Sequence, residues 1–207
     1  MISMSSFTFK VLTLIISVFS IMQISSAGDP DILTDFIVPP NTTLDGNFFT
    51  FTGFRSLFAS STLSGFKVQK ASKAEFPALD GHSVSFAVLE FPGGSVNPPH
   101  THPRSAELLF NIQGSLQVGF VDTTNKLFTQ TLKTGDMFVF PKGLVHFQYN
   151  SDTQKPAVAI SAFGSASAGT VSIPTTLFNT SIDNNVLALA FKTDVATIQT
   201  LKKGFAP

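Results

Sequence analysis

The fold is decided by two stretches of the chain, GSVNPPHTHPRSAELLFNIQG at residues 94–114 and GDMFVFPKGLVHFQYN at residues 135–150. Both stretches contain runs of aliphatic and aromatic residues interrupted by glycine and proline, which is typical of short strands. Imidazole contributes little to strand packing, so the histidines there need another explanation. Three of the four histidines of the chain lie in these stretches together with the carboxylate of Glu107; the histidines are His100, His102 and His146.

The spacing in the first stretch predicts that His100, His102 and Glu107 face one ion. His100 and His102 are two residues apart, so on a strand both rings point to the same face. Glu107 has the opposite parity for a straight strand. Pro103 does not extend a central ladder, so we expect a turn or bulge after it, with Glu107 opening the next strand and facing inward with Leu109.

The second stretch is expected to supply the fourth ligand, His146, from a strand that follows a tight corner at Pro141 and Gly143. Buried imidazoles without partners lose hydrogen bonds, at a cost of about 1–3 kcal/mol each. Three of them converging on a carboxylate are better explained by a bound cation than as scattered surface histidines. The remaining histidine, His82, follows Gly81 and is predicted to be an exposed loop residue without a role.

Three imidazoles and one carboxylate leave open positions on an ion that prefers six ligands. This donor set suits Mn(II) or Fe(II), with water or substrate completing the sphere. Zinc usually takes fewer ligands. Raw affinity places copper and zinc above manganese, so the residues alone leave Fe and Zn open beside manganese.

The pattern between residues 48 and 163 predicts an all-β fold, either a closed barrel or a double-sheet jelly roll. Leu116, Val118 and Phe120 alternate with polar or small residues, as a strand with one buried face requires. The predicted strands are Val84–Phe91, Leu108–Val121, Phe128–Leu132, Met137–Phe140, Val145–Tyr149 and Ala157–Phe163.

The end of the chain predicts a short C-terminal helical hairpin. Asn184 or Asn185 is expected to cap a helix that ends at Phe191, and Asp194 a second helix that ends before Gly204. A hairpin this small does not fold alone. It must therefore pack on the barrel or on a neighbouring subunit.

Residues 1–27 have the features of a signal peptide: Lys10, an apolar segment at residues 11–24, and Ser25-Ser26-Ala27 before the cleavage site. The alternative is a membrane anchor, which needs about 20 apolar residues and no cleavage site. We expect cleavage after Ala27, leaving residues 28–207 as a single domain. No membrane contact is then expected.

Lys plus Arg and Asp plus Glu number 13 each, so no basic surface favours nucleic acid. There is no cysteine, so stability must come from burial, metal or subunit contacts. Two sequons, at Asn41 and Asn179, are candidate glycosylation sites on a secretory route and should then lie on the surface.

Both metal-site stretches together make the chain resemble the cupin superfamily and, more closely, the plant germin-like proteins. The resemblance implies a single cupin jelly-roll β-barrel that binds manganese through His100, His102, Glu107 and His146. It also implies secretion to the plant cell wall or apoplast, and homo-oligomers, trimers or hexamers, interlocked by the C-terminal helices. The residues that carry it include Gly28-Asp29-Pro30-Asp31, Asp35-Phe36, residues 98–104, residues 135–148 and the helical tail.

Two positions depart from that family. Many germin-like proteins have a cysteine shortly after the Asp-Phe pair, whereas Ile37 follows Phe36 here, so the N-terminal arm must be held in another way. Oxalate-oxidising germins bring two asparagines to the metal. One matches Asn97, but the other falls on Ala87, whose methyl group offers no hydrogen bond to a dianionic substrate. Oxalate oxidase activity is therefore not expected.

Two classes of function remain open. In the first, the metal dismutates superoxide, and Asn97 hydrogen-bonds the incoming anion or its water. In the second, the protein is a non-catalytic extracellular glycoprotein with a storage or defence role, or a receptor that holds an organic acid on the metal. A dioxygenase or isomerase of the wider superfamily is a weaker third alternative, because no residue points to its substrate.

Overall fold

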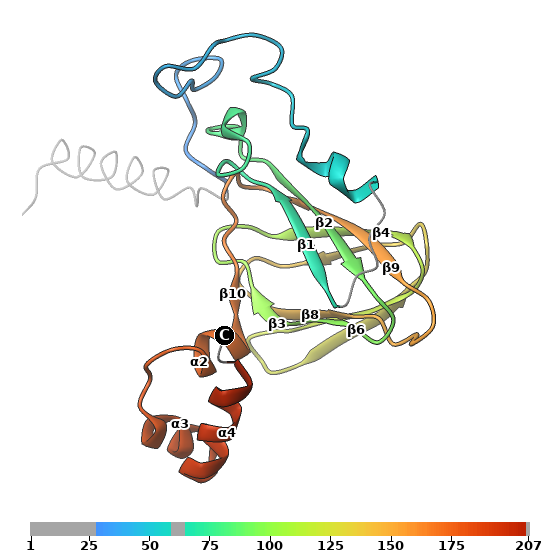
Figure 1. Cartoon of the computed structure of the whole chain (residues 1–207), viewed down its shortest axis with the longest axis vertical. Helices are drawn as coiled ribbons and strands as arrows, with labels where there is room; N and C mark the ends of the chain where they lie inside the picture. The colour runs from blue at the N-terminus through green and yellow to red at the C-terminus, as the bar shows by residue number, and fades with distance from the viewer. Residues whose placement is uncertain (1–27, 59–64, 206–207) are drawn as a thin grey trace, which may run out of the picture.

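A computed structural model describes residues 28–58 and 65–205. It consists of two antiparallel five-stranded sheets that face each other, with three short helices at one end (Figure 1). The predicted signal peptide, residues 1–27, lies outside the described residues.

The first sheet has the strand order β1-β2-β9-β4-β7 and the second the order β10-β3-β8-β5-β6. The strands of the first sheet are β1 (Lys67–Ala71), β2 (Ser85–Phe91), β9 (Ala157–Phe163), β4 (Glu107–Gln113) and β7 (Met137–Phe140). Those of the second are β10 (Val171–Ser172), β3 (Val96–Thr101), β8 (Val145–Tyr149), β5 (Leu116–Val121) and β6 (Leu127–Leu132).

The core fills the space between the sheets, because alternate residues of each strand point inward. Its fully buried members come from both sheets and include Phe91, Leu109, Leu116, Val118 and Phe140. Large apolar side chains from both sheets therefore pack between the strands that carry the histidines. The all-β jelly-roll prediction is confirmed.

Several element boundaries differ from the sequence-based prediction. The predicted strand Leu108–Val121 is two strands, β4 and β5, because Gly114 turns the chain with a φ of +75°. Strand β1 was not predicted. Four of its five residues are exposed or half-buried, so it lacks the alternation that marks a strand with one buried face.

The tail contains three helices, α2 (Ile173–Phe178), α3 (Asn184–Phe191) and α4 (Val195–Phe205), where two were predicted. Asp183, rather than either asparagine, caps α3 by accepting hydrogen bonds from two backbone N–H groups, while Asp194 caps α4 as expected. Gly204 lies within α4 and does not end it. The helices share a small core formed by Leu187, Ala188 and Ile198.

Two 3-10 helices, η1 (Gly53–Phe58) and η2 (Pro77–Leu79), lie outside the barrel strands. Within residues 28–58 and 65–205, every helix is too short or too polar to cross a lipid bilayer.

The N-terminal arm is held by hydrogen bonds that one carboxylate accepts, in place of a disulfide. Asp29 accepts hydrogen bonds from the Ser165 hydroxyl and the Ala166 N–H, each at 2.6 Å. Its own N–H donates to the Ser83 hydroxyl at 3.0 Å. The start of the arm is therefore attached to the segment that follows β9.

Candidate metal centre

Three strands place the four predicted ligands at one point inside the barrel. His100 on β3 lies directly opposite His146 on β8 in the strand register. Glu107 is the first residue of β4, and His102 directly follows β3. A turn at residues 102–106 separates the two strands, so Glu107 faces inward with Leu109, as the sequence predicted.

The four side chains are close enough to share one ion. One ligand atom from each lies within 4.8 Å of the others, and all four residues are buried. The Glu107 carboxylate oxygen Oε2 lies 3.0 Å from Nε2 of both His102 and His146. His100 Nε2 has no hydrogen-bond partner among the described residues.

Each imidazole is oriented by a backbone carbonyl. The Nδ1 atom of His100 lies 2.8 Å from the Pro98 oxygen, that of His146 lies 2.9 Å from the Leu144 oxygen, and that of His102 lies 2.5 Å from the Gly169 oxygen. A carbonyl only accepts hydrogen bonds, so each Nδ1 carries the proton. Each Nε2 therefore points to the shared position, where it can offer its lone pair to a metal ion.

The carboxylate is held on its other oxygen. Oε1 of Glu107 accepts hydrogen bonds from the Ser161 hydroxyl at 2.6 Å and from the Gln148 amide at 3.2 Å. Gln148 in turn accepts a hydrogen bond from Asn97 at 2.7 Å. Asn97, predicted to contact an incoming ligand, is therefore connected to Glu107 through one amide.

Gln148 and Ser161 are site residues that the sequence analysis did not identify. Gln148 follows His146 by two residues on β8 and so shares its inward face, which is a signal the sequence contains. Ser161 gives no such signal. It lies on β9, distant in sequence from both ligand stretches, and only the pairing of β9 with β4 brings it to Glu107.

The protonation states of the site suit a cation. Burial, together with the nearby His146, lowers the pKa of His100 to about 4, so its imidazole is neutral near pH 7. Burial alone would raise the pKa of Glu107, but hydrogen bonds with His102 and His146 outweigh it and hold the pKa well below its usual range. Three imidazole nitrogens and one ionised carboxylate are a donor set that fits a divalent transition ion.

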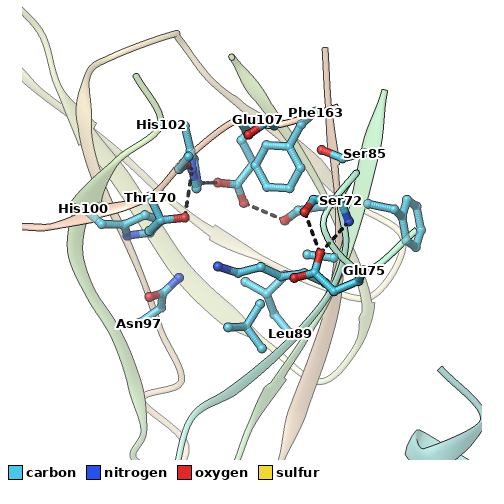
Figure 2. A pocket seen from close by; sticks show the side chains of 18 residues that line it. Ser72, Glu75, Ser85, Leu89, Asn97, His100, His102, Glu107, Phe163 and Thr170 are labelled. Atoms are coloured by element: carbon cyan, nitrogen blue, oxygen red, sulfur yellow. Dashed lines mark hydrogen bonds and ion pairs between the residues drawn. The ribbon is translucent and has the colours of Figure 1, made fainter. Parts of the chain in front are cut away.

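A cavity of about 210 Å³ opens beside these ligands. His100, Asn97 and Thr170 lie on one side of it, and Ser72 and Glu75 lie on the opposite side (Figure 2). His102 and Glu107 also line it, so a metal ion there would be accessible to a small molecule. Ala87 contributes only a methyl group to the lining.

The other residues selected from the sequence lie away from this centre. His82 is exposed in a bend, as predicted. Asn41 and Asn179, the two sequon asparagines, are both exposed.

This arrangement of sheets and ligands is that of a cupin, and residues 57–199 match the cupin family. The chain is 61% identical to germin-like protein 9-3 of Oryza sativa subsp. japonica, over 87% of this chain and 88% of the relative. It is 57% identical to the putative germin-like protein 9-2 of the same plant, over 96% of each. The protein belongs to the germin-like proteins of the cupin superfamily.

A solved structure of oxalate oxidase has the same fold. It superimposes with a TM-score of 0.76 and 31% sequence identity, and the match covers 86% of this chain and 98% of that chain.

Proposed function

We propose that the mature protein, residues 28–207, is a secreted single-domain metalloprotein that binds one Mn(II) ion at His100, His102, Glu107 and His146 and dismutates superoxide. The convergence of four buried ligand atoms within 4.8 Å beside an accessible cavity carries this proposal. When bound, manganese supplies the one-electron oxidation and reduction that convert two superoxide anions and two protons into dioxygen and hydrogen peroxide.

The residues of the chain keep the site in one geometry. The three carbonyl contacts fix the histidine rings, and the hydrogen bonds from Ser161 and Gln148 fix the carboxylate, so little reorganisation accompanies a change in metal charge. Asn97 donates one amide hydrogen to Gln148 and retains a second for an anion in the cavity.

The test is a superoxide assay on the manganese-loaded mature protein. We expect activity that a chelator abolishes and that returns when manganese is restored, and we expect none in a His146→Ala variant prepared in parallel. Metal-replete protein without chelator-sensitive activity would contradict superoxide dismutation and favour the second candidate.

The second candidate is a non-catalytic extracellular glycoprotein that uses the metal to hold an organic acid. The exposed positions of Asn41 and Asn179 support glycosylation, and the apolar and hydroxyl groups that share the cavity with the ligands support a binding role. Binding of an organic acid without turnover would favour this candidate. Oxalate oxidation is not proposed, because Ala87 presents a methyl group to the cavity.

We also propose that the protein forms homo-oligomers, as trimers or hexamers in the apoplast. The outer face of β4 and β7 supports this proposal, because the outward-facing positions of these two paired strands carry five exposed large apolar residues. These residues, the β4–β7 patch, are Leu108, Phe110, Ile112, Met137 and Val139. Leu189 on α3, which is 82% exposed, is a separate exposed apolar residue on the helices.

A further inference from the structure

Lys70 on the edge strand β1 points toward the inner face of its sheet. The register pairs Lys70 with Ala87 on β2, and Ala87 with Ser161 on β9. Residues directly opposite in antiparallel strands share a face, so Lys70 lies on the same face as the buried Ala87 and Ser161. The Ser161 hydroxyl contacts Glu107. Lys70 is therefore on the sheet face that carries the metal centre.

Two strand spacings of about 4.8 Å, roughly 10 Å in all, separate the Lys70 backbone from that of Ser161. The flexible four-carbon stem of lysine covers part of this distance toward the ligands. Ala87 lies between Lys70 and Ser161 in the register, and its methyl group is too small to block the lysine side chain. Lys70 lines the metal cavity together with His100, His102 and Glu107.

Lys70 is the only lysine or arginine among the residues that line this cavity. Within the described residues its ammonium group makes no hydrogen bond or ion pair. Glu75, an acidic residue that also lines the cavity, has its carboxylate already engaged by the Ser72 N–H at 3.0 Å and the Ser72 hydroxyl at 2.5 Å. The cavity thus contains a cation whose hydrogen-bonding capacity is unused.

We propose that Lys70 forms a second anion subsite in the metal cavity, so that the site prefers a short organic dianion, such as malonate, over a monocarboxylate. One carboxylate lies at the metal beside Asn97, and the other lies at the Lys70 ammonium. This inference rests on the proposed metal centre and specifies the ligand class that the centre accepts.

The cavity dimensions support a short ligand. A volume of about 210 Å³ is smaller than that of a typical drug-sized pocket, about 300–1,000 Å³, and suits an acid of a few carbon atoms. The metal ligands and Glu75 line opposite sides of the cavity (Figure 2), and Lys70 joins the lining from β1, two strands away from Ser161. The two anion-binding groups therefore come from different strands of the cavity lining.

An inward-pointing charge on an edge strand also has a purely structural use, because it discourages pairing with the edge of another sheet. That role needs only the charge at the edge. It does not require any preference among ligands, so ligand selectivity distinguishes the two roles.

The test is calorimetric titration of the manganese-loaded protein with malonate and with acetate, comparing the native protein with Lys70→Met, Lys70→Arg and Lys67→Met variants. Lys67 lies on the same strand with the opposite parity and serves as the matched control. We expect Lys70→Met to lower the malonate-to-acetate affinity ratio about ten-fold, equivalent to one charge-assisted hydrogen bond. Lys70→Arg and Lys67→Met should retain the ratio.

An unchanged ratio in Lys70→Met would overturn the proposal, because the metal alone would then account for malonate binding. An equal loss of acetate and malonate binding would also overturn it. Glu75→Gln should raise the ratio, since it removes a negative charge near the subsite.

A second measurement on the native protein is independent of how the variants fold. Malonate, but not acetate, should slow acetylation of Lys70 relative to Lys67, read by mass spectrometry of the two lysines. Equal rates with and without malonate would overturn the proposal. The metal content of each sample is measured separately. Metal-loaded protein without Lys70 protection overturns this inference alone, whereas protein that holds no metal contradicts the proposed function on which the inference rests.

Discussion

At the residue scale, Glu107 differs from the other ligands because both of its oxygens are engaged. Oε2 faces two histidines, while Oε1 is held by Ser161 and Gln148. A carboxylate fixed in this way loses little rotational freedom when a metal binds. The outer hydrogen bonds should therefore contribute to metal affinity without contacting the metal.

Replacing Ser161 by alanine tests this contribution. We expect Ser161→Ala to weaken manganese binding by about 10–100-fold, the usual effect of removing a group that orients a metal ligand. The dissociation constant is measured by competition with a chelator. Ser56→Ala, which changes an exposed serine outside the barrel, is the control, and equal affinities in the two variants would contradict the role of Ser161.

The lowered pKa of His100 predicts a pH dependence for the metal-free protein. In the unfolded chain His100 has the ordinary pKa of 6.5, whereas in the folded chain its pKa is about 4. Between these values the unfolded state binds the proton that the folded state excludes, so stability falls as the pH drops from 6.5 toward 4.

The free energy of unfolding, measured by urea denaturation of metal-free protein at pH 7 and pH 5, should be lower at pH 5. The decrease should be smaller in His100→Gln, which removes the titrating group. The same decrease in both proteins would assign the effect to other residues.

At the element scale, the sequence predicted the elements whose pattern is local. The turn after Pro103 and the inward direction of Glu107 followed from strand parity, and both are confirmed. Strand β1 was missed because an exposed edge strand has no alternating pattern. Ser161 was missed because its role depends on which strands pair, and strand pairing is not encoded within any one segment.

The N-terminal arm is an element whose attachment depends on one residue. Asp29→Asn removes the charge that two hydrogen bonds share, and hydrogen bonds to charged groups contribute about 1.5–3 kcal/mol when buried. Because Asp29 is half-buried, we expect the mature protein to lose about 1–2 kcal/mol of stability in urea denaturation. Asp31→Asn, an exposed change in the same arm, is the control. Equal stability of the two variants would show that the arm is held by other contacts.

At the scale of the whole molecule, the β4–β7 patch is a group of exposed apolar residues on one sheet face, the kind of surface that often marks a protein–protein contact. We expect Val139→Lys to shift the protein toward monomers, because a buried charge would oppose association. Light scattering after size-exclusion chromatography measures the mass. Lys133→Ala, outside the patch, should leave the mass unchanged, and an oligomer that persists in Val139→Lys would exclude the β4–β7 patch as the interface.

The central claim is that two distant stretches of the chain form one metal site. Its most direct test is elemental analysis of the mature protein purified from a plant secretory route, beside a Glu107→Ala variant purified in the same way. We expect one equivalent of manganese for each native chain and a large loss in the variant. Native protein without a stoichiometric metal ion, or a variant that retains it, would show that these four residues do not form the metal site.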